Sequence, residues 1–188
     1  MPLSKGSSHV AAPRWESAVI TGASTGIGAA IARRLAAAST PRITLVARDV
    51  KRLESLSREL ASNGVEAVPR ECDLTQPDAL TALCDHVAAD PPDLLVNNAG
   101  AGHFGAFAAL PRADLLASVD LNVRALVALS HAYAAPAARR GRGELLLVAS
   151  TAGFLPVPFE AVYAASKTFV IHFGEALAEE LRGSGVRV

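Results

Sequence analysis

The sequence predicts a doubly wound α/β fold, in which helices cover both faces of one parallel sheet and form a three-layer sandwich. Two observations lead to this prediction. Short, nearly continuous apolar segments alternate with longer helical segments, and parallel strands are apolar in this way because both of their faces are buried. A glycine-rich loop also joins the first apolar segment to the first helical segment.

The first strand, the glycine-rich loop and the first helix form one continuous unit. Residues 18–20 are apolar, residues 21–28 read Thr-Gly-Ala-Ser-Thr-Gly-Ile-Gly, and residues 28–38 form an alanine-rich helical segment. In this order the glycines permit a tight turn close to a pyrophosphate, and the helix N-terminus supplies N–H groups and the positive end of its dipole. The fold is therefore expected to be of the Rossmann type, which binds a dinucleotide at this turn.

The second strand and the second helix are expected at residues 43–47 and 50–62. Leucines recur at helical spacing in the second helix, at Leu53, Leu56 and Leu60, so that they share one apolar stripe. Asp49 is a candidate N-cap for this helix, and Gly64 is placed to end it.

The remaining elements continue the same alternation. Further strands are expected at residues 67–69, 94–96 and 145–149, and further helices at residues 77–88, 112–139 and 160–182. Residues 1–15 are expected to be a flexible leader. Residues 16–188 then form a single dinucleotide-binding domain, which matches the usual domain size.

Composition limits the possible partners. The chain has 188 residues, 51% hydrophobic and 19% charged, with a formal net charge of zero, so nucleic acid and anionic membranes lack an electrostatic basis as partners. We expect no membrane span, because no uncharged apolar run reaches about 18 residues, and no secretory signal. The expected location is cytoplasmic, with Cys72 and Cys84 as reduced thiols. No metal site is expected, because the histidines and cysteines lack ligand spacing.

The candidate chemistry lies near the end of the chain. Tyr163 and Lys167 are four residues apart in a helical segment, so their side chains share a face. An ammonium beside a phenol favours the phenolate, and such a phenol can exchange a proton with a carbonyl oxygen. Ser150, thirteen residues before Tyr163, can orient the same oxygen with its hydroxyl.

With these motifs the chain resembles the short-chain dehydrogenase/reductase family from about residue 17 to its last residue. Residues 21–28 match the glycine motif of the family, residues 72–74 its adenine-contacting segment, and residues 97–100 its Asn-Asn-Ala-Gly motif. Asn122 matches the catalytic asparagine. Residues 98–107 and 153–159 look most like an uncharacterised bacterial branch, which also resembles microsomal ketoacyl and ketosteroid reductases.

The resemblance implies two sets of site residues. The implied catalytic residues are Asn122, Ser150, Tyr163 and Lys167. The implied cofactor-binding residues are Gly22, Ser24, Thr25, Gly26, Ile27, Gly28, Arg48, Asp73, Leu74, Asn98, Ala99, Gly100, Tyr163 and Lys167. Asn122 is implied to distort its helix and to hold a water that relays protons to Lys167, whereas His103 is a weaker candidate for the substrate site.

The end of the second strand favours NADP(H) as the cofactor. An NAD enzyme of this family carries an acidic residue there for the ribose 2′-hydroxyl, whereas this chain has Ala47 followed by Arg48. A guanidinium pairs well with a 2′-phosphate. Two observations leave NAD open: Thr25 stands where NADP enzymes are often basic, and Asp49 is an alternative ligand for the ribose.

The implied activity is NADP(H)-dependent interconversion of a ketone or aldehyde and its alcohol. The apolar residues 154–159 favour an apolar carbonyl substrate, and the two long helices are implied to form a homodimer or homotetramer. In the resembled family residues 183–188 are the opening of the sixth strand, and a substrate-covering loop and a seventh strand follow. The sheet is therefore expected to be truncated at the sixth strand, and the chain is either a fragment or naturally short. The competing expectation is a dinucleotide-binding protein without turnover.

Overall fold

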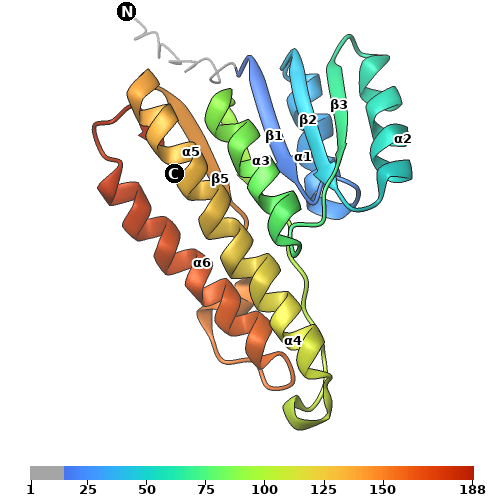
Figure 1. Cartoon of the computed structure of the whole chain (residues 1–188), viewed down its shortest axis with the longest axis vertical. Helices are drawn as coiled ribbons and strands as arrows, with labels where there is room; N and C mark the ends of the chain where they lie inside the picture. The colour runs from blue at the N-terminus through green and yellow to red at the C-terminus, as the bar shows by residue number, and fades with distance from the viewer. Residues whose placement is uncertain (1–14) are drawn as a thin grey trace, which may run out of the picture.

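The structure is a computed structural model that describes residues 15–188. The predicted leader, residues 1–15, lies outside the described residues except for Trp15, which packs against the hydrophobic core of the domain. The domain contains a six-stranded parallel sheet in the order β3-β2-β1-β4-β5-β6 (Figure 1). The predicted doubly wound fold is confirmed. The strands are β1 (Ser17–Thr21), β2 (Arg42–Ala47), β3 (Glu66–Glu71), β4 (Leu94–Asn97), β5 (Gly143–Leu147) and β6 (Val186–Arg187).

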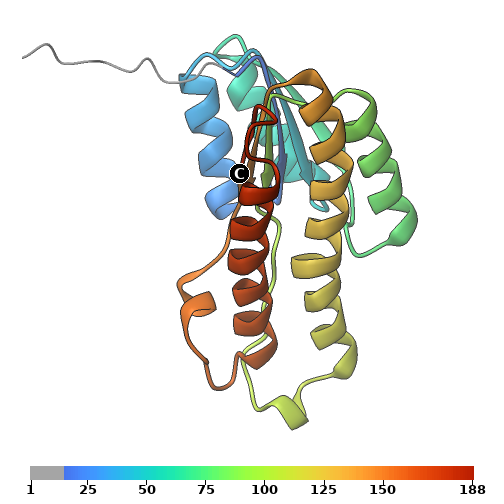
Figure 2. The ribbon, with the colours of Figure 1, turned by 90° about the vertical axis from the view of Figure 1, so that its left-hand side faces the viewer.

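Helices lie on both sides of the sheet (Figure 2). The α-helices are α1 (Gly26–Ala37), α2 (Val50–Ala61), α3 (Pro77–Ala89), α4 (Arg112–Val119), α5 (Leu126–Arg140) and α6 (Ala161–Glu180). Leu53, Leu56 and Leu60 of α2 are buried, as their spacing predicts. The predicted cap is confirmed, since the Asp49 carboxylate accepts a hydrogen bond from the backbone N–H of Arg52 at 3.1 Å.

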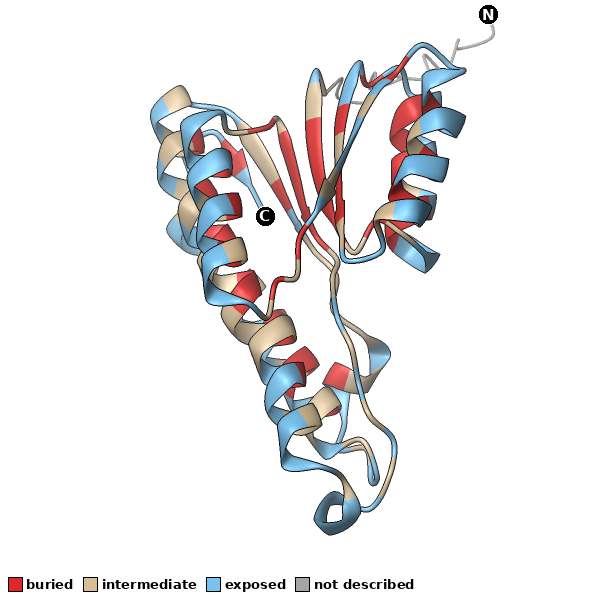
Figure 3. Cartoon of the chain, turned by 45° about the vertical axis from the view of Figure 1, so that its right-hand side comes forward, coloured by how far each residue is buried: buried red, intermediate tan, exposed pale blue. Residues whose placement is uncertain are grey.

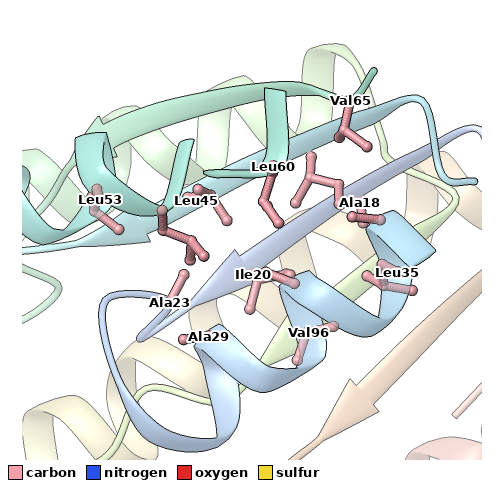
Figure 4. Packing of buried hydrophobic residues seen from close by; sticks show 14 of the residues in the cluster. Ala18, Ile20, Ala23, Ala29, Leu35, Leu45, Leu53, Leu60, Val65 and Val96 are labelled. Carbon is pink, nitrogen blue, oxygen red and sulfur yellow. The ribbon is translucent and has the colours of Figure 1, made fainter. Parts of the chain in front are cut away.

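Two hydrophobic clusters fill the space between the sheet and its helices. Ala18 and Ile20 of β1 belong to the first cluster, which lies under α1 and α2 (Figure 4). Val19 belongs to the second cluster, which lies under α3 and α5. Successive side chains of a strand point to opposite faces, so an apolar strand supplies both clusters. Leu177 and Leu181, near the end of α6, also pack against the second cluster.

Some element boundaries differ from the sequence-based expectations. β5 covers Gly143–Leu147 rather than residues 145–149, because its partner β4 ends at Asn97, which is the residue paired with Leu147. The predicted helix at residues 112–139 is α4 and α5 joined by a π-helical segment, η2 (Asp120–Ala125). Two short 3₁₀ helices, η1 (Phe107–Ala109) and η3 (Thr151–Phe154), were not predicted.

The loops that follow β4 and β5 form an arm that extends beyond the sheet together with α4 and the start of α6 (Figure 3). The two loops contact each other: the N–H of Gly105 donates to the carbonyl of Phe159 at 2.9 Å, and the rings of Phe104 and Phe159 are 5.8 Å apart. Because ligands of open α/β sheets bind at the carboxyl ends of the strands, the arm lies beside the expected site.

Residues 112–140 form one helical run that is long and apolar enough to cross a membrane by length and composition, since it contains an 18-residue window with a mean hydropathy of 1.2. In this fold, Leu126, Leu129 and Tyr133 of that run pack in the second cluster. A core helix passes the same criterion, so the run is weak evidence of a membrane span, and the expected lack of a span stays a prediction.

Candidate functional site

The glycine-rich loop packs tightly against the loop that follows β4. Gly22 has φ +66°, and a Cβ on it would lie 2.8 Å from Nδ2 of Asn98. A Cβ on Gly28 would lie 2.6 Å from the same atom. Gly26 has φ +53° but nothing within 4 Å of its Cβ position. The outer glycines therefore permit close packing, and the middle one shapes a turn that faces open space.

The first helix begins at this turn with backbone N–H groups available. Thr25 is the N-cap residue of α1, and its side chain makes no capping hydrogen bond. A helix N-terminus presents unsatisfied N–H groups and the positive end of a dipole, which together favour a phosphate. Ile27, in the same turn, is 61% exposed, so this turn lies at the surface of the described part of the chain.

Asn98 and Thr21 tie the ends of β1 and β4 together. The Asn98 side chain donates to the carbonyls of Thr21 at 2.9 Å and Gly22 at 3.2 Å. The buried Thr21 hydroxyl accepts from the backbone N–H groups of Asn98 and Ala99, both at 3.0 Å. The amide of Asn98 therefore binds the protein itself and holds the glycine-rich loop against the end of β4.

A cleft of about 810 Å³ runs along the carboxyl ends of the strands. Twelve of the predicted cofactor-binding residues line it: Gly22, Ser24, Thr25, Gly26, Ile27, Arg48, Asp73, Leu74, Asn98, Ala99, Gly100 and Tyr163. Gly28 and Lys167 do not, because Gly28 packs under the loop and Lys167 is buried behind it. A volume of this size lies in the range of small-molecule and cofactor sites.

The cleft crosses neighbouring strands in the order of the sheet. Asp73 follows β3, Arg48 follows β2, Gly22 follows β1, Asn98 follows β4, and Val148 follows β5. Neighbouring strands lie about 4.8 Å apart, so a cleft across five of them is on the order of 19 Å long. It therefore suits an elongated ligand.

The end of the cleft at β2 and β3 carries both signs of charge. Arg48 and Arg52 both line it, and Arg52 Nε lies 3.2 Å from Oδ2 of Asp49. Burial would raise the pKa of Asp73, but hydrogen bonds from the N–H and hydroxyl of Thr75, together with the charge of Arg48, lower it. Asp73 is therefore ionised near neutral pH, and its acceptor bonds are with Thr75 rather than with the start of α3.

Tyr163 and Lys167 lie together near the start of α6, as their spacing predicts. Lys167 Nζ is 5.9 Å from the centroid of the Tyr163 ring and donates to the carbonyl of Val148 at 2.8 Å. Lys167 is 4% exposed, and burial lowers its pKa. Tyr163 is half-buried and borders the cleft, whereas the Lys167 ammonium lies in the interior beside the tyrosine ring.

Asn122 lies in the π-helical segment η2, and the local helix distortion expected at this residue is confirmed. Its carboxamide accepts from the N–H of Ala101 at 2.9 Å and donates to the carbonyl of Ala101 at 2.8 Å and to Ser166 Oγ at 2.9 Å. The Ser166 hydroxyl in turn donates to the carbonyl of Tyr163 at 2.7 Å. Asn122 therefore links the loop after β4 to α6, and its amide N–H groups are occupied.

Ser150 caps η3 at the start of the loop after β5. Its Oγ accepts from the backbone N–H of Ala152 at 3.2 Å. A serine hydroxyl that accepts one bond keeps its own proton for another acceptor. His103, the weaker substrate-site candidate, lines a small cavity inside the arm with Phe107, Leu110 and Phe159 rather than the main cleft, and its Nδ1 lies 3.1 Å from Ser118 Oγ.

Several cleft residues escaped the sequence analysis. Arg52 carries a recognisable signal, because it follows Arg48 by four residues and lies in the first turn of α2, beside its N-cap Asp49. Thr75, Leu121 and Val148 carry none, because they reach the cleft only through the packing of their loops and of η2.

The comparisons with known proteins agree with this geometry. A family model for short chain dehydrogenases matches residues 16–188. A very-long-chain 3-oxoacyl-CoA reductase of Pyricularia oryzae is 36% identical over 177 residues, which cover 91% of this chain and 53% of that protein. The chain spans little more than half the length of this relative and of another curated relative, a short chain dehydrogenase of Pseudocercospora fijiensis.

Two solved structures share the fold over nine-tenths of the chain. A short-chain dehydrogenase from Sphingobium yanoikuyae, in complex with NADPH, has a TM-score of 0.87 at 35% identity and covers 90% of this chain and 67% of its own. A bulky-bulky ketone specific alcohol dehydrogenase from Comamonas testosteroni has a TM-score of 0.86 at 35% identity, covering 90% and 69%. The chain belongs to the short-chain dehydrogenase family.

Proposed function

We propose that this protein is an NADP(H)-dependent oxidoreductase that interconverts a ketone or aldehyde and the corresponding alcohol. The observation that carries the proposal is that Tyr163 borders the same cleft as the glycine loop, Arg48 and Asp73. A cofactor that lies along this cleft would place its far end beside a phenol that can move a proton. The members of the short-chain dehydrogenase family are oxidoreductases. The similar Sphingobium protein was solved in complex with NADPH.

The residues of the cleft fit a phosphorylated dinucleotide. The open turn at Gly26 and the exposed N-terminus of α1 suit its pyrophosphate. Arg48 and Arg52 suit a 2′-phosphate, because guanidinium groups pair with phosphate oxygens through charged hydrogen bonds. Asp49 is bound to the N-terminus and to the Arg52 side chain of α2, which argues against its serving as a ligand of an unphosphorylated ribose.

In the proposed reaction the nicotinamide supplies or accepts the hydride, and the protein manages the proton and the orientation. Tyr163 donates its phenolic proton to the carbonyl oxygen during reduction and takes it back during oxidation. Ser150 donates a hydrogen bond to the same oxygen, where negative charge develops. Lys167 holds positive charge beside the phenol and binds the ribose of the nicotinamide.

Asn122 is proposed to act on the path that brings protons to Lys167. Both amide hydrogens of its side chain are donated within the protein. A relay water beside Asn122 would therefore donate hydrogen bonds to nearby acceptor groups rather than accept one from this amide. The side chain itself joins the loop after β4 to α6 and so fixes Lys167 and Tyr163 relative to the cleft.

An apolar carbonyl compound is the proposed class of substrate. Phe104, Phe154, Leu155 and Phe159 are all more than half exposed, and they lie on the two loops of the arm beside the catalytic residues. The similar Comamonas enzyme is specific for bulky ketones. Exposed aromatic side chains can contact such a substrate with little loss of conformational entropy.

A homodimer or homotetramer in the cytoplasm completes the proposal. The outer surface of α6 carries a stacked pair of rings, Phe169 and Phe173, with centroids 5.6 Å apart, and Phe169 is exposed. An interface through α5 and α6 would cover them. Cys72 and Cys84 are free thiols, which suits a reducing compartment. A sedimentation experiment that gave a folded monomer at micromolar concentration would rule out the assembly.

The central test combines cofactor binding with turnover. NADPH is titrated by fluorescence, and reduction of benzophenone is followed by NADPH absorbance in the unaltered chain and in Tyr163→Phe. Loss of the phenolic proton acts on the transition state, so we expect turnover to fall by about 10²–10⁴-fold while the affinity for NADPH stays nearly the same. Equal turnover in Tyr163→Phe would refute the acid/base role. Binding without turnover in both proteins is also expected of a fragment, so the same assay on a chain that includes the substrate-covering loop separates a fragment from the non-catalytic alternative.

A further inference from the structure

The loop after β4 holds three residues, 100–102, against α6 in a fixed conformation. Asn122 binds the middle residue, Ala101, at both its N–H and its carbonyl, at 2.9 and 2.8 Å. Asn122 is 1% exposed, so water does not compete with these two bonds. The residues on either side of Ala101, Gly100 and Gly102, are therefore fixed in position as well.

A side chain on either glycine would enter the space of Tyr163 or Lys167 near the start of α6. A Cβ on Gly100 would lie 3.2 Å from Lys167 Nζ. A Cβ on Gly102 would lie 2.7, 2.8 and 3.1 Å from Cδ2, Cγ and Cβ of Tyr163. Carbon atoms ordinarily pack about 3.5–4.0 Å apart, so the bare backbone of Gly102 lies directly against the base of the Tyr163 ring.

The backbone conformation gives no other reason for glycine at this position. Gly102 is not among the glycines with positive φ, so an alanine is compatible with its backbone. Of these three Tyr163 atoms, Cβ is bonded directly to the backbone of α6 and cannot swing aside, whereas Cγ and Cδ2 can move away only if the whole ring changes its rotamer. The Ser166 hydroxyl, which bonds Tyr163 and Asn122 at 2.7 and 2.9 Å, connects the helix to the same asparagine that holds the loop.

We propose that Gly102 is a positioning residue for Tyr163: its lack of a side chain lets the tyrosine ring lie on the loop backbone, which fixes where the phenolic oxygen points. The consequence for turnover rests on the proposed acid/base role of Tyr163. A methyl group at residue 102 would displace the ring by about 1 Å to restore ordinary contact distances. Proton transfer needs hydrogen-bond distances of about 2.6–3.2 Å, so this displacement separates the phenol from its partner.

The contact itself can be tested without any substrate. The chain has two tyrosines, so labelling with 3-fluorotyrosine gives a ¹⁹F spectrum whose signals are assigned with Tyr133→Phe and Tyr163→Phe. We expect Gly102→Ala to shift the Tyr163 signal and to leave the signal of Tyr133, which is buried in the second cluster. The control is Gly64→Ala, which strains a backbone with φ +79° but has nothing within 4 Å of its Cβ. An unchanged Tyr163 signal in Gly102→Ala would overturn the proposal.

A second pair of variants covers the case in which Gly102→Ala does not fold. Removal of the ring makes room for the methyl group, so Gly102→Ala combined with Tyr163→Ala is expected to fold, with the thermal stability of Tyr163→Ala alone. If the double variant were less stable to heat than Tyr163→Ala alone, residue 102 would need glycine for a reason unrelated to the tyrosine, and the proposal would be overturned.

The consequence for catalysis is measured as benzophenone reduction by NADPH. We expect Gly102→Ala to lower kcat on the order of 10²-fold, with an unchanged Kd for NADPH because residue 102 does not line the cofactor cleft. In the Tyr163→Phe background the same change should lower kcat hardly any further, since the displaced ring carries no hydroxyl. Additive losses would overturn positioning through Tyr163. A shifted fluorine signal in a chain with no turnover would instead refute the proposed function and support the contact.

Discussion

Tyr133 makes the stability of the fold sensitive to alkaline pH in a way that can be calculated. Its ring is fully buried in the second cluster, and its hydroxyl donates to the carbonyl of Asp93 at 3.3 Å. Burial raises the pKa of Tyr133 to about 12 from an ordinary value of 10.0, because the phenolate would lose its hydration. The folded protein therefore holds this proton more tightly than the unfolded chain does.

The sign of the effect follows from proton binding. Below pH 10 both states keep the proton, and the stabilisation is fully present; as pH rises toward 12, the unfolded chain loses the proton first and the stabilisation is lost. A rise of about two pKa units corresponds to about 3 kcal/mol when complete. About 1 kcal/mol of this loss falls between pH 9 and pH 11.

The perturbation is Tyr133→Phe, and the assay is urea unfolding of both proteins at pH 8, 9, 10 and 11. At pH 8 the variant is expected to be about 1 kcal/mol less stable, because it lacks one hydrogen bond. The difference in unfolding free energy should shrink by about 1 kcal/mol between pH 9 and pH 11. Other groups that titrate, such as Cys72, Cys84 and Lys167, are common to both proteins and cancel. A pH-independent difference would refute the reasoning.

Three further predictions follow from the cleft and the core. Arg48→Ala and Arg52→Ala should each weaken NADPH binding by about 1.5–3 kcal/mol with little effect on NADH, whereas the remote Arg58→Ala should change neither; equal losses for both cofactors would contradict a 2′-phosphate contact. Burial raises the pKa of both cysteine thiols, so Ellman's reagent should label the folded chain slowly at pH 8 and two thiols at once in urea; rapid labelling of the native protein would contradict the raised pKa values. Leu83→Ala, at a fully buried position, should cost about 2–5 kcal/mol in denaturant unfolding, whereas Leu116→Ala, at an exposed one, should cost about 0.5 kcal/mol or less.

The sequence by itself determined the architecture and most of the cleft. Alternating apolar and helical segments are local patterns, and the physics of burial connects them directly to a parallel sheet covered on both faces. The glycine motif, Arg48 and the Tyr163–Lys167 pair are also readable locally, because a turn and one helical repeat fix their relative positions. Twelve predicted cofactor residues accordingly line one cleft.

Only the tertiary structure decided what several of these residues contact. From residue type alone, the side-chain amides of Asn98 and Asn122 could each bind a ligand. In the fold, both amides bind backbone groups of neighbouring loops. His103 follows the cofactor loop in sequence but lies in the packing of the arm. The contact of Gly102 with Tyr163 joins residues 61 positions apart, and no local pattern encodes it. Such contacts depend on how loops from different strands meet, and that meeting is fixed by the packing of the whole domain.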